Sequence, residues 1–297
     1  MSDDDFPRIV SVDDHVIEPK NLWQDRLPAK YREIGPRVYR QGVSEMSYVG
    51  GRFKVTPDDD GTPCDWWAYE KLRVPMTRVM AAAGFPREEV QVVPITFEEM
   101  RPGCYDPVER LADMDTAWIE ASLCYPTFPR FCGQTFAEAD DKELALLCVQ
   151  GYNDWMVEEW CGGSDGRLIP MCLIPLWDPE LAAAEVRRNA DRGVRAVCFS
   201  EIPPNLGLPS IHDADRHWDP FFAACARPRG DTAVKGKSGA LGIVELVWKA
   251  EEQTRMAESR AIAAVQTAQL EVEFAGRRIE VDSDEPTLRM GRLPHNE

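Results

Sequence analysis

The chain has little positive charge. Its 297 residues include 34 Lys and Arg against 51 Asp and Glu, which gives a formal net charge of −17 at pH 7. A surface that binds nucleic acid normally carries a basic patch, and no dense Lys/Arg cluster occurs in this sequence. We therefore expect no nucleic-acid partner and favour a small-molecule substrate.

The sequence also lacks a long apolar run. No segment approaches the roughly 20 apolar residues that a membrane-spanning helix needs. The start, Met1 to Asp5, is acidic, whereas a signal peptide begins with basic residues. These features predict a cytoplasmic protein with no membrane partner. A hydrophobic content of 44% is enough for a sizeable core, and the length suits one barrel-sized domain or two ordinary ones.

Paired cysteines are missing as well. The nine cysteines are scattered singly, without a C-x-x-C pair, and their number is odd. In a chain without a signal peptide, this pattern favours reduced and mostly buried thiols over disulfides. A cysteine-based zinc site or nucleophile is the less favoured alternative, because no cysteine has a base or a second thiolate beside it in the sequence.

Histidine is scarce, and one of the four histidines stands in the most informative segment, residues 9–19. There an apolar, strand-like run leads to Asp13 and His15. Residues two apart in an extended chain point to the same side, so this carboxylate and this imidazole can bind one metal ion together. The alternative is that Asp13 and Asp14 end the strand or cap a turn, and that His15 is an ordinary surface histidine.

From residue 108 onward, helix-like and strand-like segments alternate. Strands are predicted at 9–12, 118–125, 168–175 and 195–199, and helices at 108–116, 138–161, 178–192 and 218–226. Near-continuous apolar strands separated by helices are typical of a parallel sheet covered by helices. The pattern therefore predicts an α/β fold with four β/α units.

Five segments occur in an order that resembles a known family. They are residues 12–19 with Leu22 and Trp23, then 110–115, 152–155, 167–170 and 192–197. Together they are similar to the amidohydrolase-related family that includes aminocarboxymuconate semialdehyde decarboxylase, a branch of the metal-dependent amidohydrolase superfamily. The resemblance covers residues 8–226.

The resemblance implies a (β/α)8 TIM-type barrel with one catalytic divalent ion, commonly zinc. It implies Asp13 and His15 as metal ligands at the end of the first strand, and hydrolysis or non-oxidative decarboxylation of a small organic acid. Glu18 follows shortly after and is a candidate for orienting a metal ligand. Its alternative role is that of a surface carboxylate before Pro19.

A long insertion, residues 20–101, separates the first predicted strand from the next helix. It is rich in proline, glycine and aromatic residues, and long loops in compact domains are usually functional. One reading is a lid over the site that contains Trp23, Trp66 and Trp67. The other is that these tryptophans pack the insertion onto the barrel.

The resemblance ends near Ala226. The family places further ligands later, a histidine after strand five, often another after strand six, and an acid after strand eight. Here the chain continues with a basic, glycine-containing segment, 227–239, which we interpret as a linker or junction. His212, Asp213 and His217, in the loop after the fourth strand, are candidate substitutes. Their alternatives are a solvated turn or a substrate contact.

The remainder, residues 240–297, looks unrelated to the front part. A long amphipathic helix is predicted at 239–268 and a β-hairpin at 270–281, and residues 286–292 weakly resemble the opening of a forkhead-associated domain.

The expected fold is thus a partial barrel of about four β/α units with an unrelated tail. Two functions follow from it. The first is a metal-dependent hydrolase or carboxy-lyase, impaired because later ligands are missing. The second is an inactive truncated or fused protein that acts through an oligomer or partner interface. The exposed edge at 195–199 would be covered by the tail helix or by a second chain in a homo-oligomer that completes the barrel.

Overall fold

A computed structural model of the chain describes residues 8–50, 52–233, 240–246, 270–274 and 277–281. The chain divides into two units, Met1–Cys225 and Ala226–Glu297. The division falls next to the boundary predicted at residue 226. Each unit is described by itself.

The first unit is built on parallel strands. They are β1 (Ile9–Val16), β7 (Ile119–Pro126), β8 (Leu168–Ile169), β9 (Met171–Cys172) and β10 (Ala196–Val197). β7 pairs in parallel with both β1 and β8, and β9 pairs in parallel with β10. β8 and β9 are separated only by Pro170, which has no N–H to donate to a ladder. The parallel strands therefore form two sheets, β1-β7-β8 and β9-β10, which follow one another in chain order.

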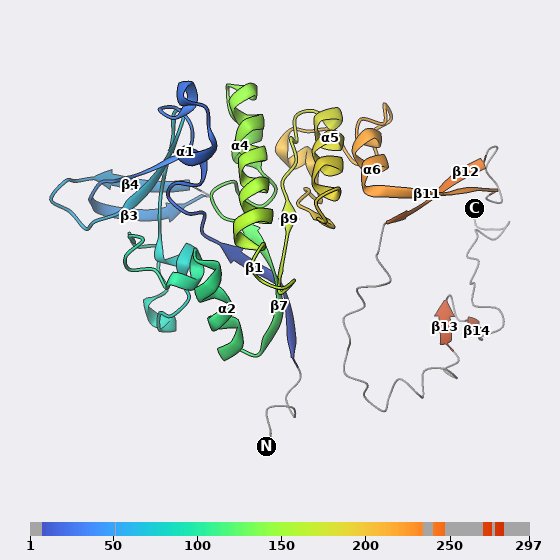
Figure 1. Ribbon diagram of the computed structural model, residues 1–297, viewed down its shortest axis with the longest axis horizontal. Helices are drawn as coiled ribbons and strands as arrows, with labels where there is room; N and C mark the ends of the chain where they lie inside the picture. Colours follow the sequence, from blue (N-terminus) through green and yellow to red (C-terminus); the bar gives the residue numbers. More distant parts are fainter. Residues whose placement is uncertain (1–7, 51, 234–239, 247–269, 275–276, 282–297) are drawn as a thin grey trace, which may run out of the picture. The chain divides into compact units, whose positions relative to one another are not determined.

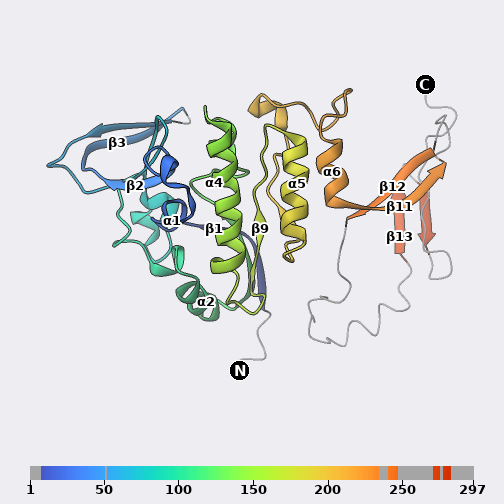
Figure 2. The ribbon, with the colours of Figure 1, turned by 45° about the horizontal axis from the view of Figure 1, so that its top comes forward.

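A helix follows each of these strands or leads to the next one. The helices are α2 (Pro107–Thr116), α4 (Lys142–Trp155) with its π-helical continuation Met156–Trp160, α5 (Pro179–Ala190) and α6 (Asp219–Cys225). Both views show α4, β9, α5 and α6 side by side (Figures 1 and 2). The side chains of Asp106, Asp141 and Asp178 accept backbone N–H bonds and cap the helices that they precede.

The four predicted β/α units are confirmed, with changes in strand length. β1 extends to Val16, four residues beyond the predicted strand, and the segment 168–175 contains only two short strands. The described residues form a mixed α/β fold and no closed barrel. None of the described helices is long and apolar enough to cross a membrane. All nine cysteines are free thiols, and eight of them are buried, as predicted.

The insertion after β1 has its own small sheets. It contains α1 (Leu22–Arg26), β2 (Arg37–Arg40), β3 (Val43–Val49), β4 (Arg52–Pro57), β5 (Asp65–Tyr69) and β6 (Leu72–Pro75). β5 lies between β2 and β6, and β3 pairs with β4; all these pairs are antiparallel. The short helix α3 (Gln134–Ala137) lies farther along the chain, after β7.

Aromatic side chains join the insertion to the rest of the first unit. Trp23 stands edge-on to Trp67, with ring centroids 5.3 Å apart, and Trp67 stacks on Phe128 at 4.7 Å. Trp66 is also buried, in a smaller core with Val43. The structure therefore favours the interpretation that these tryptophans pack the insertion, and not the interpretation that they form a lid.

The second unit contains two antiparallel hairpins. β11 (Ala226–Ala233) pairs with β12 (Ala240–Leu246), and β13 (Leu270–Phe274) pairs with β14 (Arg277–Val281). The hairpin predicted at 270–281 is confirmed.

Two predictions for this unit need correction. Residues 227–233 of the predicted linker belong to strand β11. The predicted helix is wrong over residues 240–246, which form strand β12. The β-branched Ile243 and Val244 favour a strand, and Gly242 disfavours a helix. The rest of that predicted helix and the segment that resembles a forkhead-associated domain lie outside the described residues.

Candidate metal site at the end of strand β1

Asp13 and His15 lie near the carboxyl end of β1. His15 is opposite Tyr125 of β7 in the parallel register, and the two rings have centroids 5.9 Å apart. Burial raises the pKa of Tyr125, and the nearby Cys198 and Asp13 raise it further. Both Asp13 and His15 are exposed. Active sites of β/α barrels occupy this end of the strands.

A β-bulge precedes the pair. Ser11 pairs with Ser122 and Asp14 with Cys124, so Val12 and Asp13 together face Leu123 alone. The extra residue brings Ser11 and Asp14 to one face of the strand, although they are three residues apart. The sequence pattern predicts a regular strand and gives no sign of this bulge.

The side chain of Asp14 forms hydrogen bonds within the sheet. Its carboxylate accepts hydrogen bonds from the Ser11 hydroxyl, at 2.8 Å, and from the Ser122 hydroxyl. The neighbouring Cys124 thiol lies 3.7 Å from the Arg110 guanidinium of α2, which identifies this face as the one that packs against helices. The ring of His15, by contrast, lies by Tyr125 on the other face.

Arg110 fixes the backbone at the candidate site. Its guanidinium donates to the His15 carbonyl at 2.8 Å and to the Gly103 carbonyl at 2.6 Å, and it lies over the ring of Trp160. Arg110 stands in one of the family-like segments, but the sequence predicts no role for it. A hydrogen bond between residues 95 positions apart leaves no local signal in the sequence.

Glu18 joins the turns that follow two neighbouring strands. Its side chain is fully buried, and its two oxygens accept the backbone N–H groups of Thr127 and Phe128, each at 2.9 Å. Burial raises the pKa of Glu18 to about 7, although the two backbone hydrogen bonds act to lower it. The surface alternative for Glu18 is therefore wrong. Its role in orienting a metal ligand stays a prediction.

The described residues do not complete a metal site. A catalytic zinc ion usually has three protein ligands. Among the residues that the structure describes, no three His, Cys, Asp or Glu side chains are grouped so that they could hold a metal ion. His212 is exposed, and the ring of His217 packs against Trp218 at 4.7 Å. The predicted substitutes, including Asp213, therefore do not join Asp13 and His15.

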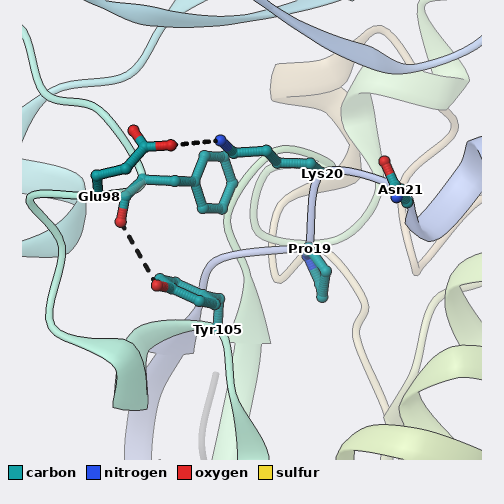
Figure 3. A pocket seen from close by; sticks show the side chains of 6 residues that line it. Pro19, Lys20, Asn21, Glu98 and Tyr105 are labelled. Carbon is teal, nitrogen blue, oxygen red and sulfur yellow. Dashed lines mark hydrogen bonds and ion pairs between the residues drawn. The ribbon is translucent and has the colours of Figure 1, made fainter.

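Three cavities surround the ends of β1 and β7. One of about 310 Å³ is lined by Asp13, His15 and Arg110, among others. A second, of about 320 Å³, follows β1; there Lys20 pairs with Glu98 at 3.1 Å, and Tyr105 donates to the Phe97 carbonyl (Figure 3).

The third cavity is the largest, at about 880 Å³. Its lining is mainly apolar and includes Ile17 after β1 and Phe128 after β7. It also contains the guanidinium side chains of Arg73 and Arg130. The buried hydroxyl of Thr127, another lining residue, has no hydrogen-bond partner in the described part of the chain. The cavity thus combines an apolar surface with cationic and polar groups.

Comparison with known proteins identifies the class of this chain. The amidohydrolase family profile matches residues 47–229, more than half of the 297 residues, and the chain belongs to this family. The matched range begins after β1, so it does not include Asp13 and His15.

Two solved structures are similar to the chain. An amidohydrolase from Mycobacterium avium subsp. paratuberculosis K-10 is 22% identical, with a TM-score of 0.40, over 64% of this chain and 48% of that one. A 2,6-dihydroxybenzoate decarboxylase, solved with 2,6-dihydroxybenzoate, is 15% identical, with a TM-score of 0.35, over 74% and 47%. The chain spans about half the length of these structures. No curated protein matches it.

Proposed function

We propose that this chain carries the first-strand part of the active site of a metal-dependent hydrolase or carboxy-lyase that acts on a small organic acid. The observation that supports this most is that Asp13 and His15 stand two residues apart near the carboxyl end of a parallel strand, where the ring of His15 lies by Tyr125. A carboxylate and an imidazole are common zinc ligands, so zinc is the metal we expect.

The proposed division of roles follows the contacts. Asp13 and His15 hold the metal, and Arg110 positions His15 by binding its carbonyl. A divalent ion in such a site polarises water or a substrate oxygen. Because the described residues supply two ligands where three are usual, we assign no reaction step and propose that an isolated chain is impaired.

The large cavity supports an organic acid as the substrate class. Its apolar lining suits a hydrocarbon or aromatic body, and the guanidinium groups of Arg73 and Arg130 suit a carboxylate. Arg130 also pairs with Glu138 at 2.8 Å, and Glu138 lines the same cavity. A bound carboxylate would therefore compete with the Glu138 carboxylate for the guanidinium of Arg130.

Zinc binding to the purified chain tests the proposal. We expect zinc to bind and the Asp13→Ala/His15→Ala variant to lose it, whereas the His212→Ala/Asp213→Ala variant, which removes a second His–Asp pair, keeps it. Metal analysis and calorimetric titration measure both. Less than about a tenth of an equivalent of zinc, unchanged in the first double variant, would overturn the assignment of the ligands.

A second candidate is an inactive protein that acts through an interface. It is favoured by three exposed apolar residues on β1, Ile9, Val10 and Val12, whose exposed fractions are 52%, 44% and 64%. A chain that binds no metal and shows no turnover, yet associates through β1, would support this candidate.

A further inference from the structure

The run of parallel strands in the first unit begins and ends at an open edge. Among the described residues, β1 pairs only with β7, and β10 pairs only with β9. Open edges present unpaired backbone N–H and C=O groups, which natural proteins usually cover or protect with charge. Here Val10 and Val12 of β1 are apolar and exposed. An edge with exposed apolar side chains is of the kind that another strand or chain covers.

Within the described part of the chain, one face of the sheet is also only partly covered. Along β7, Ser122 and Cys124 are buried towards the helices, whereas Leu123 and Tyr125 on the other face are only partly buried. Tyr125 stacks on Phe131, which is itself 46% exposed. Parallel sheets are normally covered on both faces, and a closed barrel achieves this by packing the inner faces of all its strands together.

We propose that two copies of this chain close one eight-stranded barrel around a two-fold axis. Each copy supplies four parallel strand positions, namely β1, β7, β8 with β9, and β10. Rotation about an axis along the barrel places β10 of one copy beside β1 of the other at both junctions, and all neighbours stay parallel. Eight is the number of strands that closes a β/α barrel.

The same symmetry completes the metal site. In a ring of eight strands, the first and fifth positions lie opposite each other, so β1 of the partner copy occupies position five. The two Asp13–His15 pairs then face the same interior at the same end of the barrel. Together they supply four side chains, of which three suffice for a catalytic zinc ion and leave its fourth position open to water or substrate. This step rests on the proposed function, because it takes Asp13 and His15 as metal ligands.

The tail of the chain fits this edge less well than a second copy. Its described strands, β11 with β12 and β13 with β14, form antiparallel hairpins. A hairpin added to β1 or β10 brings one antiparallel neighbour with every parallel one. A second copy supplies parallel strands at both edges at once.

Sedimentation equilibrium of the full chain tests the closure. We expect the wild type to be a dimer. Val12→Asp should convert it to a monomer, because the substitution places a charge in the buried junction between β1 of one copy and β10 of the other. Val108→Asp, on α2, is the matched control: Val108 is 72% exposed and Val12 is 64% exposed, and the control should stay dimeric. Val10→Lys repeats the test should Val12→Asp lose its circular-dichroism signal. A monomeric wild type, or a dimer that survives these changes in folded variants, would overturn the closure.

Zinc titration separates this inference from the proposed function. One zinc ion per two chains, lost in Asp13→Ala/His15→Ala while the dimer persists, supports the shared site. One zinc ion per chain in a monomer overturns the dimer and leaves the proposed ligands in place. A dimer that binds no zinc overturns the ligands and leaves the closure in place.

Discussion

Glu18 is a residue whose ionisation couples directly to folding. Its buried carboxylate receives two backbone N–H groups from the turn after β7, so it ties together the ends of β1 and β7. Because burial raises its pKa from 4.5 to about 7, the folded chain holds a proton there that the unfolded chain releases at lower pH. This contribution to stability is complete below about pH 4.5 and is lost as the pH rises through about 7.

The corresponding prediction concerns Glu18→Gln. We expect the variant to lose the part of the pH dependence of unfolding that lies between about pH 4.5 and 7, on the order of 3 kcal/mol at most. Urea unfolding at a series of pH values measures it. Glu201→Gln, at an exposed position, is the control and should keep the wild-type slope. Identical slopes for wild type and Glu18→Gln would refute the coupling.

Arg110 gives a second prediction at this scale. Its hydrogen bonds to the His15 and Gly103 carbonyls hold the backbone that presents the imidazole. Removal of a group that supports a metal ligand typically weakens metal affinity by about 10- to 100-fold. Arg110→Ala should therefore weaken zinc binding by about tenfold in a competition titration, whereas Arg87→Ala, at an exposed position, should not. Equal affinities in the two variants would show that Arg110 has no positioning role.

Among the elements, the insertion after β1 is held by its aromatic contacts. Trp23 on α1 is fully buried, lies edge-on to Trp67 and Phe136, and donates its indole N–H to the Cys148 carbonyl of α4 at 2.9 Å. These contacts connect the insertion to the helical layer. We infer that the insertion and the sheet unfold together.

Replacement of Trp23 tests this packing. Trp23→Ala removes a large buried side chain and leaves a buried carbonyl without its donor, so we expect a loss of about 3–5 kcal/mol in the free energy of unfolding. Val108→Ala, at an exposed position, should change it by less than about 0.5 kcal/mol. Denaturant unfolding followed by tryptophan fluorescence and circular dichroism measures both. A loss below about 1 kcal/mol in Trp23→Ala would contradict the role of Trp23.

The elements also show what the sequence can predict. Helices α2 and α5 begin at Asp–Pro, where a cap and a first-turn proline act within a few residues, so their starts are readable. The bulge at Val12 and Asp13 depends on pairing with a strand more than 100 residues away. The hydrogen bonds of Glu18 and Arg110 depend on the same long-range pairing. The sequence therefore predicts the β/α order and where the candidate ligands Asp13 and His15 stand, but not the groups that hold this backbone.

At the scale of the whole molecule, the charge bears on the proposed dimer. Each chain carries a formal net charge of −17, so two copies repel each other while the junctions between them bury apolar residues. Salt screens the repulsion and leaves apolar burial in place. We therefore expect the dimer to tighten when sodium chloride is raised, as measured by sedimentation equilibrium. Dissociation at high salt would indicate an interface of ion pairs and would contradict an apolar junction.

X-ray absorption at the zinc edge tests most directly that Asp13 and His15 are the metal ligands. The account predicts a shell of nitrogen and oxygen only, at about 2.0–2.2 Å, with the imidazole signature lost in His15→Ala. Sulfur at about 2.3 Å would identify ligands among the nine cysteines instead and would contradict the assignment of Asp13 and His15.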